Sequence, residues 1–196
     1  SITATDASGN AAVCTFTVTP EDVTLPSILA CPANISVDNN ATVCGAVISY
    51  PTVTALDNCA GFISPTLTGG QLSNTIFPVG VTPVEYEAAD GNGNSAFCNF
   101  TVTVVDVEDP IIVCPSDVTA NAVIGTCVAD VNYNLPTVSD NCSGVDSTLL
   151  VGTYPNSSFS VGTTLVTWEA NDAAGNTSTC SFNVIVLDAE SPIITC

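Results

Sequence analysis

The chain has 196 residues, including 19 Asp or Glu, 10 Cys and no Lys, Arg or His. The net charge of −19 excludes nucleic-acid binding through basic contacts, because no side chain can neutralise a phosphate. Catalysis by a histidine base or a lysine Schiff base is excluded, and no apolar run approaches the ~18 residues of a membrane helix. The cysteine density predicts disulfides and an extracellular or cell-surface location.

A short motif near the start of the chain recurs twice. Its copies are Asp6-Ala-Ser-Gly-Asn10, Asp90-Gly-Asn-Gly-Asn94 and Asp172-Ala-Ala-Gly-Asn176, and a cysteine follows each copy four residues later. Asp, Asn and Gly supply the Asx-turn and positive-φ positions of a tight turn, so each copy predicts a hairpin. Successive copies lie 84 and 82 residues apart, which predicts a tandem repeat.

The motif and the cysteines divide the chain into four segments. Residues 1–19 match the last strands of a repeat, residues 20–105 and 106–187 are two complete repeats, and residues 188–196 match a first strand. We therefore expect the chain to be a window cut from, or processed out of, a longer array. A repeat of about 83 residues buries only a marginal core, so we expect additional staples.

Each complete repeat consists of short alternating runs bounded by Gly, Pro, Asn and Asp, without a helical period. Apolar residues alternate from Cys31 to Val37, a turn follows at 38–40, and the alternation resumes from Cys44 to Tyr50. The second repeat follows the same pattern. About seven such strands per repeat predict an all-β fold of tandem immunoglobulin- or fibronectin III-like β-sandwiches with disulfides.

The four cysteines of a repeat permit three pairings. Cys31 and Cys44 flank one turn at similar distances, which predicts a bond across that hairpin. The main alternative joins Cys44 to Cys98. The resulting prediction is Cys31–Cys44, Cys59–Cys98, Cys114–Cys127 and Cys142–Cys180, with Cys14 and Cys196 unpaired within the chain.

The complete pattern reads Cys-Pro, Cys-Gly/Val-Ala, Asp-Asn-Cys, Phe-x-Val-Gly and Asp-x-x-Gly-Asn-x-x-x-Cys-x-Phe-x-Val. It resembles the HYR (hyalin repeat) family over essentially the whole chain. The resemblance implies tandem immunoglobulin-like sandwiches in extracellular adhesion proteins, with no catalytic role. One departure is that Thr24 stands where the next linker has Glu108, and an extra residue precedes Cys31. This departure weakens the expectation of a site at the first linker.

Acidic and amide side chains from three loops are expected at one end of each repeat. In an immunoglobulin-like unit, the incoming linker, the loop after the second strand and the last hairpin turn share that end. Calcium takes six to eight oxygen ligands, and clustered carboxylates repel one another without a cation. The alternative is that Asp and Asn only form Asx turns. The candidate ligands are Asp22, Asp57, Asn58, Asp90 and Asn94 in the first complete repeat, and Asp106, Glu108, Asp109, Asp140, Asn141, Asp172 and Asn176 in the second.

The N-glycosylation pattern Asn-x-Ser/Thr also occurs several times. In a chain so rich in Asn, Ser and Thr, matches arise by chance, and only a eukaryotic source would make them relevant. The candidate acceptors are Asn34, Asn40, Asn99, Asn141, Asn156 and Asn176.

The predicted function is structural. We expect a repeat segment of a long extracellular adhesin or surface fibre, stapled by disulfides and rigidified by calcium, with neighbouring repeats of the same protein as partners. An enzyme is not expected, because the paired carboxylates recur in every repeat and no insertion forms a cleft. The alternatives are a module that binds a cell-surface glycan or protein through the variable loops 67–72 and 151–158, and a subunit that self-associates into extracellular filaments. Nucleic acid and membrane insertion are not expected.

Overall fold

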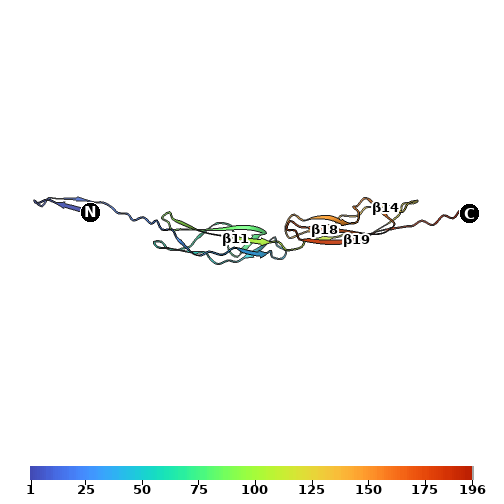
Figure 1. Cartoon of the computed structure of the whole chain (residues 1–196), viewed down its shortest axis with the longest axis horizontal. Helices are drawn as coiled ribbons and strands as arrows, with labels where there is room; N and C mark the ends of the chain where they lie inside the picture. Colours follow the sequence, from blue (N-terminus) through green and yellow to red (C-terminus); the bar gives the residue numbers. More distant parts are fainter. Residues whose placement is uncertain (196) are drawn as a thin grey trace. The chain divides into compact units, whose positions relative to one another are not determined.

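The computed structural model describes residues 1–195, and within them it contains β-strands and no helix (Figure 1). The chain divides into two compact units. Unit 1 comprises Ser1–Ala33, Tyr50–Leu72 and Pro83–Phe100, and unit 2 comprises Asn34–Ser49, Ser73–Thr82 and the chain from Thr101 onward. These units do not follow the predicted repeats, because two segments of the first complete repeat belong to unit 2.

Unit 1 contains an N-terminal hairpin, a three-stranded antiparallel sheet of order β3-β6-β7, and the pairing of β8 with β10. Its strands are β1 (Ile2–Thr5), β2 (Ala11–Cys14), β3 (Ser27–Ala30), β6 (Thr54–Asp57), β7 (Gly61–Ile63), β8 (Thr66–Gly69) and most of β10 (Gly80–Ala89). The next strand, β11 (Ser95–Val105), begins in unit 1 and ends in unit 2.

Unit 2 contains part of the first complete repeat and all of the second. From the first repeat come β4 (Ile35–Asp38), which runs parallel to the end of β11, and β5 (Gly45–Ile48), which pairs with β9 (Thr75–Pro78). In the second repeat the sheets have the orders β13-β19-β18-β16, β14-β17 and β12-β15. These strands are β12 (Ile111–Val113), β13 (Val118–Asn121), β14 (Val128–Val131), β15 (Thr137–Ser139), β16 (Asp146–Val151), β17 (Ser157–Ser160), β18 (Gly162–Asn171) and β19 (Thr177–Leu187).

The core of the second repeat lies between the β14-β17 pair and the sheet that contains β18 and β19, which run side by side in the orange and red part of Figure 1. Alternation along β19 buries Phe182, Val184 and Val186. Tyr133 packs edge-on against Phe182, with ring centroids 5.0 Å apart. Each large apolar side chain buried in this way contributes about 1.5–3 kcal/mol. The prediction of an all-β sandwich fold is therefore confirmed.

The disulfides differ from the predicted ones. The structure joins Cys31 to Cys98 in unit 1, and Cys44 to Cys142 and Cys114 to Cys180 in unit 2. All four predicted bonds, Cys31–Cys44, Cys59–Cys98, Cys114–Cys127 and Cys142–Cys180, are therefore wrong, as is the alternative Cys44–Cys98.

The error has a topological cause. The strands that flank the turn at 38–40 do not form a hairpin, because β4 pairs in parallel with β11 whereas β5 pairs with β9. The strand β13 likewise pairs in parallel with β19, and β14 pairs with β17. Cys98 lies on β11 and is only 1% exposed, and its sulfur is bonded to that of the more exposed Cys31.

The free cysteines among residues 1–195 are Cys14, Cys59 and Cys127, all exposed. The expectation that Cys14 has no partner is met, whereas Cys196 lies outside the described residues. Cys59 and Cys127 were expected to be bonded to Cys98 and Cys114, and both expectations are wrong.

Candidate metal sites

The linker into the second repeat and the loop after β15 bring two carboxylates together. Oxygens of Asp106 and Asp140 lie within 4.8 Å of each other and of the Cys142 sulfur. Each carboxylate is oriented by an Asx-type hydrogen bond. The N–H of Glu108 donates to Asp106 Oδ1 (3.3 Å), and the N–H of Cys142 donates to Asp140 Oδ2 (2.8 Å). Only 5% of the Asp106 surface is exposed.

Two oxygens at this second site lack a partner. Asp140 Oδ1 and Asn141 Oδ1 are buried and, among the described residues, accept no hydrogen bond. A buried polar atom without a partner costs about 1–3 kcal/mol, and more when it is charged. Because the chain has no cationic side chain, no residue can offset the two carboxylates.

The first complete repeat contains the same arrangement in unit 1. A carboxylate oxygen of Asp22, a carboxylate oxygen of Asp57 and the Cys59 sulfur lie within 4.8 Å of one another. The N–H groups of Cys59 and Ala60 both donate to Asp57 Oδ1 (2.8 Å each), while the buried Asp57 Oδ2 has no partner among residues 1–195. Only 5% of Asp57 is exposed. The acidic pair is therefore a property of both repeats.

The Asp-x-x-Gly-Asn turn holds the linker at both sites. Asn176 Nδ2 donates to the backbone oxygen of Asp106 (3.2 Å) and to Asp172 Oδ2 (2.7 Å). In the first repeat, Asn94 Nδ2 donates to the backbone oxygen of Asp22 (3.0 Å) and to Asp90 Oδ2. Turn and linker are thus joined through one amide group.

The carboxylates of these turns are occupied by hydrogen bonds. The side-chain hydrogen bond from Asn94 is the main effect that lowers the pKa of Asp90. Burial acts to raise the pKa of Asp172, but the hydrogen bonds from Asn176 and from backbone N–H groups outweigh it, so the pKa falls below its ordinary value. For Asp90, Asn94, Asp172 and Asn176, the Asx-turn alternative describes the observed contacts.

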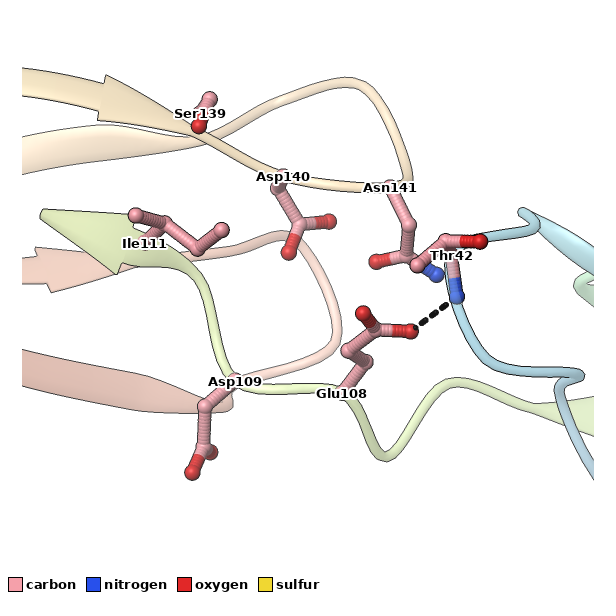
Figure 2. A pocket seen from close by; sticks show the side chains of 7 residues that line it. All are labelled: Thr42, Glu108, Asp109, Ile111, Ser139, Asp140 and Asn141. Atoms are coloured by element: carbon pink, nitrogen blue, oxygen red, sulfur yellow. Dashed lines mark hydrogen bonds between the residues drawn. The ribbon is translucent and has the colours of Figure 1, made fainter.

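The remaining predicted ligands lie in different environments. Figure 2 shows Glu108 directed toward Thr42, whose N–H donates to Glu108 Oε2 (2.7 Å), and Asp109 pointing away from Asp140. Asn58 is exposed and donates to the Cys59 sulfur (3.3 Å). Neither Asp109 nor Asn58 therefore joins a carboxylate pair.

A small hollow of about 260 Å³ adjoins the second site. Two contacts close to it join the 39–45 turn of the first complete repeat to the loop after β15: Asn141 Nδ2 donates to the backbone oxygen of Val43 (3.3 Å), and Cys44 is bonded to Cys142. Its lining is Thr42, Glu108, Asp109, Ile111, Ser139, Asp140 and Asn141 (Figure 2).

No residue pattern predicts this connection. The contact of Thr42 uses its backbone N–H, which leaves no residue signature. The cysteine register marked Cys44 and Cys142, but only a comparison between repeats, rather than within one, would have paired them.

The donor set fits a hard cation. Carboxylate and amide oxygens suit calcium, whereas a soft metal prefers thiolate. The Cys142 sulfur lies close to the carboxylates of Asp106 and Asp140, but it is in a disulfide and cannot act as a thiolate ligand. A hydrogen bond to Asp22, together with partial desolvation and the nearby negative charges, raises the pKa of the exposed Cys59 thiol and disfavours the thiolate. The residues that could hold a cation are Asp22 and Asp57 at the first site, and Asp106, Asp140 and Asn141 at the second.

The glycosylation acceptors differ in availability. Asn99 and Asn156 are exposed. The Oδ1 atoms of Asn34 and Asn40 accept hydrogen bonds from the backbone, and the amides of Asn141 and Asn176 donate to backbone oxygens. Glycosylation stays a prediction.

Curated relatives match nearly the whole chain. Hyalin of Strongylocentrotus purpuratus is 37% identical over 97% of this chain and 16% of its own length. Hyalin of Lytechinus variegatus is 34% identical over 96% of this chain and 37% of its own length. The "Sushi, von Willebrand factor type A, EGF and pentraxin domain-containing protein 1" of Rattus norvegicus is 30% identical over 85% of this chain and 5% of its own length. The chain thus spans well under half of these relatives.

Similar solved structures contain cadherin domains. The human mucin-like protocadherin EC1-2 structure is 12% identical, covers 84% of this chain and 98% of its own, and has a TM-score of 0.40. Mouse cadherin-23 EC22-24 is 19% identical, covers 83% of this chain and 67% of its own, and has a TM-score of 0.39. Within residues 1–195, no helix could span a membrane.

The HYR domain profile matches residues 21–104 and 105–186. HYR repeats are adhesion-type modules without enzymatic activity, so the prediction that this chain is not an enzyme is confirmed. The disulfides and the hyalin relatives agree with an extracellular domain. The chain therefore belongs to the HYR domain family, and the resemblance noted in its sequence is confirmed.

Proposed function

We propose that the chain is a structural segment of a long extracellular adhesin or surface fibre, with disulfide-stapled repeats and calcium bound where a linker enters a repeat. The observation that supports calcium is the presence of buried carboxylate oxygens without a partner, Asp57 Oδ2 and Asp140 Oδ1, each beside a second carboxylate. The immediate partners are neighbouring repeats of the same protein.

The electrostatics of the chain favour a bound cation. Two carboxylates within 4.8 Å repel each other, and burial strengthens the repulsion by lowering the local dielectric. A divalent cation would replace this repulsion by attraction and would supply the missing partner of Asp57 and Asp140. Calcium suits the sites better than magnesium, because it tolerates irregular geometry and accepts carboxylate, amide and carbonyl oxygens.

Calcium would act on the mobility of the linker. At the second site, the cation would tie Asp106 of the linker to Asp140 of the loop after β15. The Cys44–Cys142 bond and the contact of Glu108 with Thr42 already connect the 39–45 turn to the same region. Together these contacts would restrict bending at the linker, which is the property a spacer in a surface fibre needs.

Calorimetric titration and thermal melts test the calcium sites. The wild type should bind calcium at two sites and melt at a higher temperature in calcium than in chelator, because a ligand that binds only the folded state stabilises it. Asp57→Asn and Asp140→Asn should each lose one binding event. In chelator both variants should be at least as stable as the wild type, because one repelling charge is gone.

The matched control is Asp146→Asn, which removes one exposed carboxylate at the start of β16, outside both sites. It should keep both binding events. Absence of calcium binding by the wild type, or equal loss in the control, would contradict the calcium proposal.

Ligand binding is the second candidate, and one observation favours it. Tyr154, in the variable loop 151–158, is 58% exposed, and its ring packs edge-on against Trp168 with centroids 5.7 Å apart. A fixed and exposed aromatic ring suits recognition of a partly apolar ligand. Binding on a glycan array that Tyr154→Ser abolishes would support this function, and no binding by the wild type would remove it.

The filament alternative is tested by sedimentation of the native chain. A reversible, concentration-dependent increase in mass would support self-association, whereas a single monomeric species at all concentrations would oppose it.

A further inference from the structure

Cys127 lies in a turn that reproduces the turn of Cys44. Each turn is fixed by the same backbone hydrogen bonds, including one to the end of the last strand of its repeat. In the first repeat they are Asn39 N to Val105 O (2.8 Å), Asn40 N to Gly45 O (2.7 Å) and Val43 N to Asn40 O (3.0 Å). In the second they are Ala122 N to Leu187 O (2.9 Å), Val123 N to Val128 O (2.8 Å) and Thr126 N to Val123 O (2.9 Å).

The acidic contact to the turn is also reproduced. Glu108 Oε2 accepts from the N–H of Thr42 (2.7 Å), and Glu190 Oε1 accepts from the N–H of Gly125 (2.9 Å). The turn of Cys127 therefore already carries the linker contact that accompanies a disulfide at Cys44.

The surroundings of the two cysteines differ in one respect. Beside the turn of Cys44, the hollow of about 260 Å³ is lined in part by the Asp140-Asn141 loop. Beside Cys127, a larger hollow of about 550 Å³ is lined by the turn and by the linker 188–193. The exposed Cys127 thiol faces a space of the kind that an Asp-Asn-Cys loop borders at Cys44.

The complementary loop is also present in the chain. Asp57-Asn58-Cys59 has the sequence of Asp140-Asn141-Cys142, and in both loops the cysteine N–H donates to the aspartate carboxylate (2.8 Å). Cys59 nevertheless has an exposed free thiol. Each complete repeat thus contains one turn with a cysteine, Cys44 or Cys127, and one Asp-Asn-Cys loop, at Cys59 or Cys142.

We propose that Cys127 forms a disulfide with the cysteine of the Asp-Asn-Cys loop of another HYR repeat. Cys59 forms the equivalent disulfide with the turn cysteine of another repeat. The asparagine of the incoming loop would donate to the backbone oxygen of Thr126, as Asn141 donates to Val43. The proposal goes beyond the structural function given above and does not depend on calcium.

Bond formation is an ordinary thiol–disulfide exchange. The two thiols lose two protons and two electrons as their S–S bond forms. A low-molecular-weight disulfide such as oxidised glutathione accepts both electrons, and its own S–S bond breaks to give two thiols.

The test uses the full chain extended after Cys196 by a second copy of residues 115–196, so that Cys196 takes the register position of Cys114. The extended chain is oxidised in a glutathione buffer, alkylated, and digested without reduction by a protease that cleaves after Asp and Glu. Acidic residues separate all ten cysteines of the natural chain onto different peptides. Residues 118–130 carry Cys127, and residues 141–146 carry Cys142.

The expected product is peptide 118–130 linked to peptide 141–146. In a Cys142→Ser variant of the appended copy alone, this product should disappear and Cys127 should be alkylated. A linked pair of 109–117 with 173–188 shows that each variant has formed the Cys114–Cys180 bond. Absence of the linked 118–130 and 141–146 pair from the extended chain, or a bond from Cys127 to peptide 7–21 of Cys14, would overturn the proposal.

Discussion

The two linker sites contain the same pair of aspartates but differ in what surrounds them. Both pairs lie within 4.8 Å, and in both an asparagine amide from the Asp-x-x-Gly-Asn turn binds the linker backbone. At the first site, Cys59 is a free thiol and Thr24 takes the place of an acidic linker residue. At the second, Cys142 is bonded to Cys44 and Glu108 contacts Thr42.

The difference separates two levels of organisation. The aspartate pair and its Asx turns are formed within a single repeat, since they are present at both sites. The disulfide and the glutamate contact at the second site also involve the 39–45 turn of the preceding repeat. Cation binding and cross-linking should therefore be independent of each other.

The largest effect is expected from removal of the bond between repeats. Cys44→Ala with Cys142→Ala makes the second site resemble the first. The bond spans 98 residues, so loop-closure entropy predicts a loss of about 5 kcal/mol in the free energy of unfolding. Calcium affinity at the second site should stay within about threefold, ~0.7 kcal/mol. Denaturant unfolding and calorimetric titration measure the two quantities.

Cys59→Ala is the control for this pair, because Cys59 is exposed and unbonded. It should leave the free energy of unfolding unchanged. Loss of calcium binding in the Cys44/Cys142 variant would show that the two levels are coupled.

A smaller and symmetric effect is expected from the linker aspartates. Asp22→Asn and Asp106→Asn each remove one charged ligand, and each should lower the calcium affinity of its own site by about tenfold or more, ~1.4 kcal/mol. Titration calorimetry resolves the two sites. A loss at the second site alone would mean that the disulfide, rather than the aspartate pair, creates the cation site.

The next largest effect is expected from loss of the glutamate contact, which joins a linker to the preceding turn. Glu108→Gln and Glu190→Gln keep an acceptor oxygen but remove its charge, so each should weaken its hydrogen bond by about 1 kcal/mol. Hydrogen exchange should become faster at the Thr42 amide in the first variant and at the Gly125 amide in the second. Unchanged exchange at either amide would show that the glutamate does not hold that turn.

The smallest effect concerns the turns that both repeats share. Because the folded-state pKa values of Asp90 and Asp172 are lowered from 3.8, these groups contribute stability that is fully present above pH 3.8 and is lost as the pH falls through their folded pKa values. In chelator, the stability difference between the wild type and Asp90→Asn/Asp172→Asn should therefore shrink on acidification below pH 3.8. A difference that is independent of pH would show that these carboxylates are not the ionised acceptors of the turns.

Repetition made much of the fold predictable. The three Asp-x-x-Gly-Asn motifs set the register, and alternation identified inward residues such as Phe182, Val184 and Val186. The disulfides were not predictable in the same way. A turn at 38–40 has the same residues whether its strands pair or diverge, and here they diverge into different sheets.

The site was predictable as a region but not atom by atom. The loop positions predicted that Asp106 lies near Asp140 and that Asp22 lies near Asp57, and both pairs are present in the structure. Whether a carboxylate oxygen is free depends on which backbone N–H groups reach it, and those of Asp172 are already occupied. The amino-acid sequence alone does not show whether an aspartate oxygen already accepts such hydrogen bonds.

Disulfide mapping of the native chain tests the central claim, that the turn of one repeat is bonded to the Asp-Asn-Cys loop of the next. The chain is alkylated and digested after acidic residues without reduction. We predict that peptide 39–57 is linked to peptide 141–146. Linkage of peptide 39–57 to peptide 23–38, the bond across a hairpin, would contradict it.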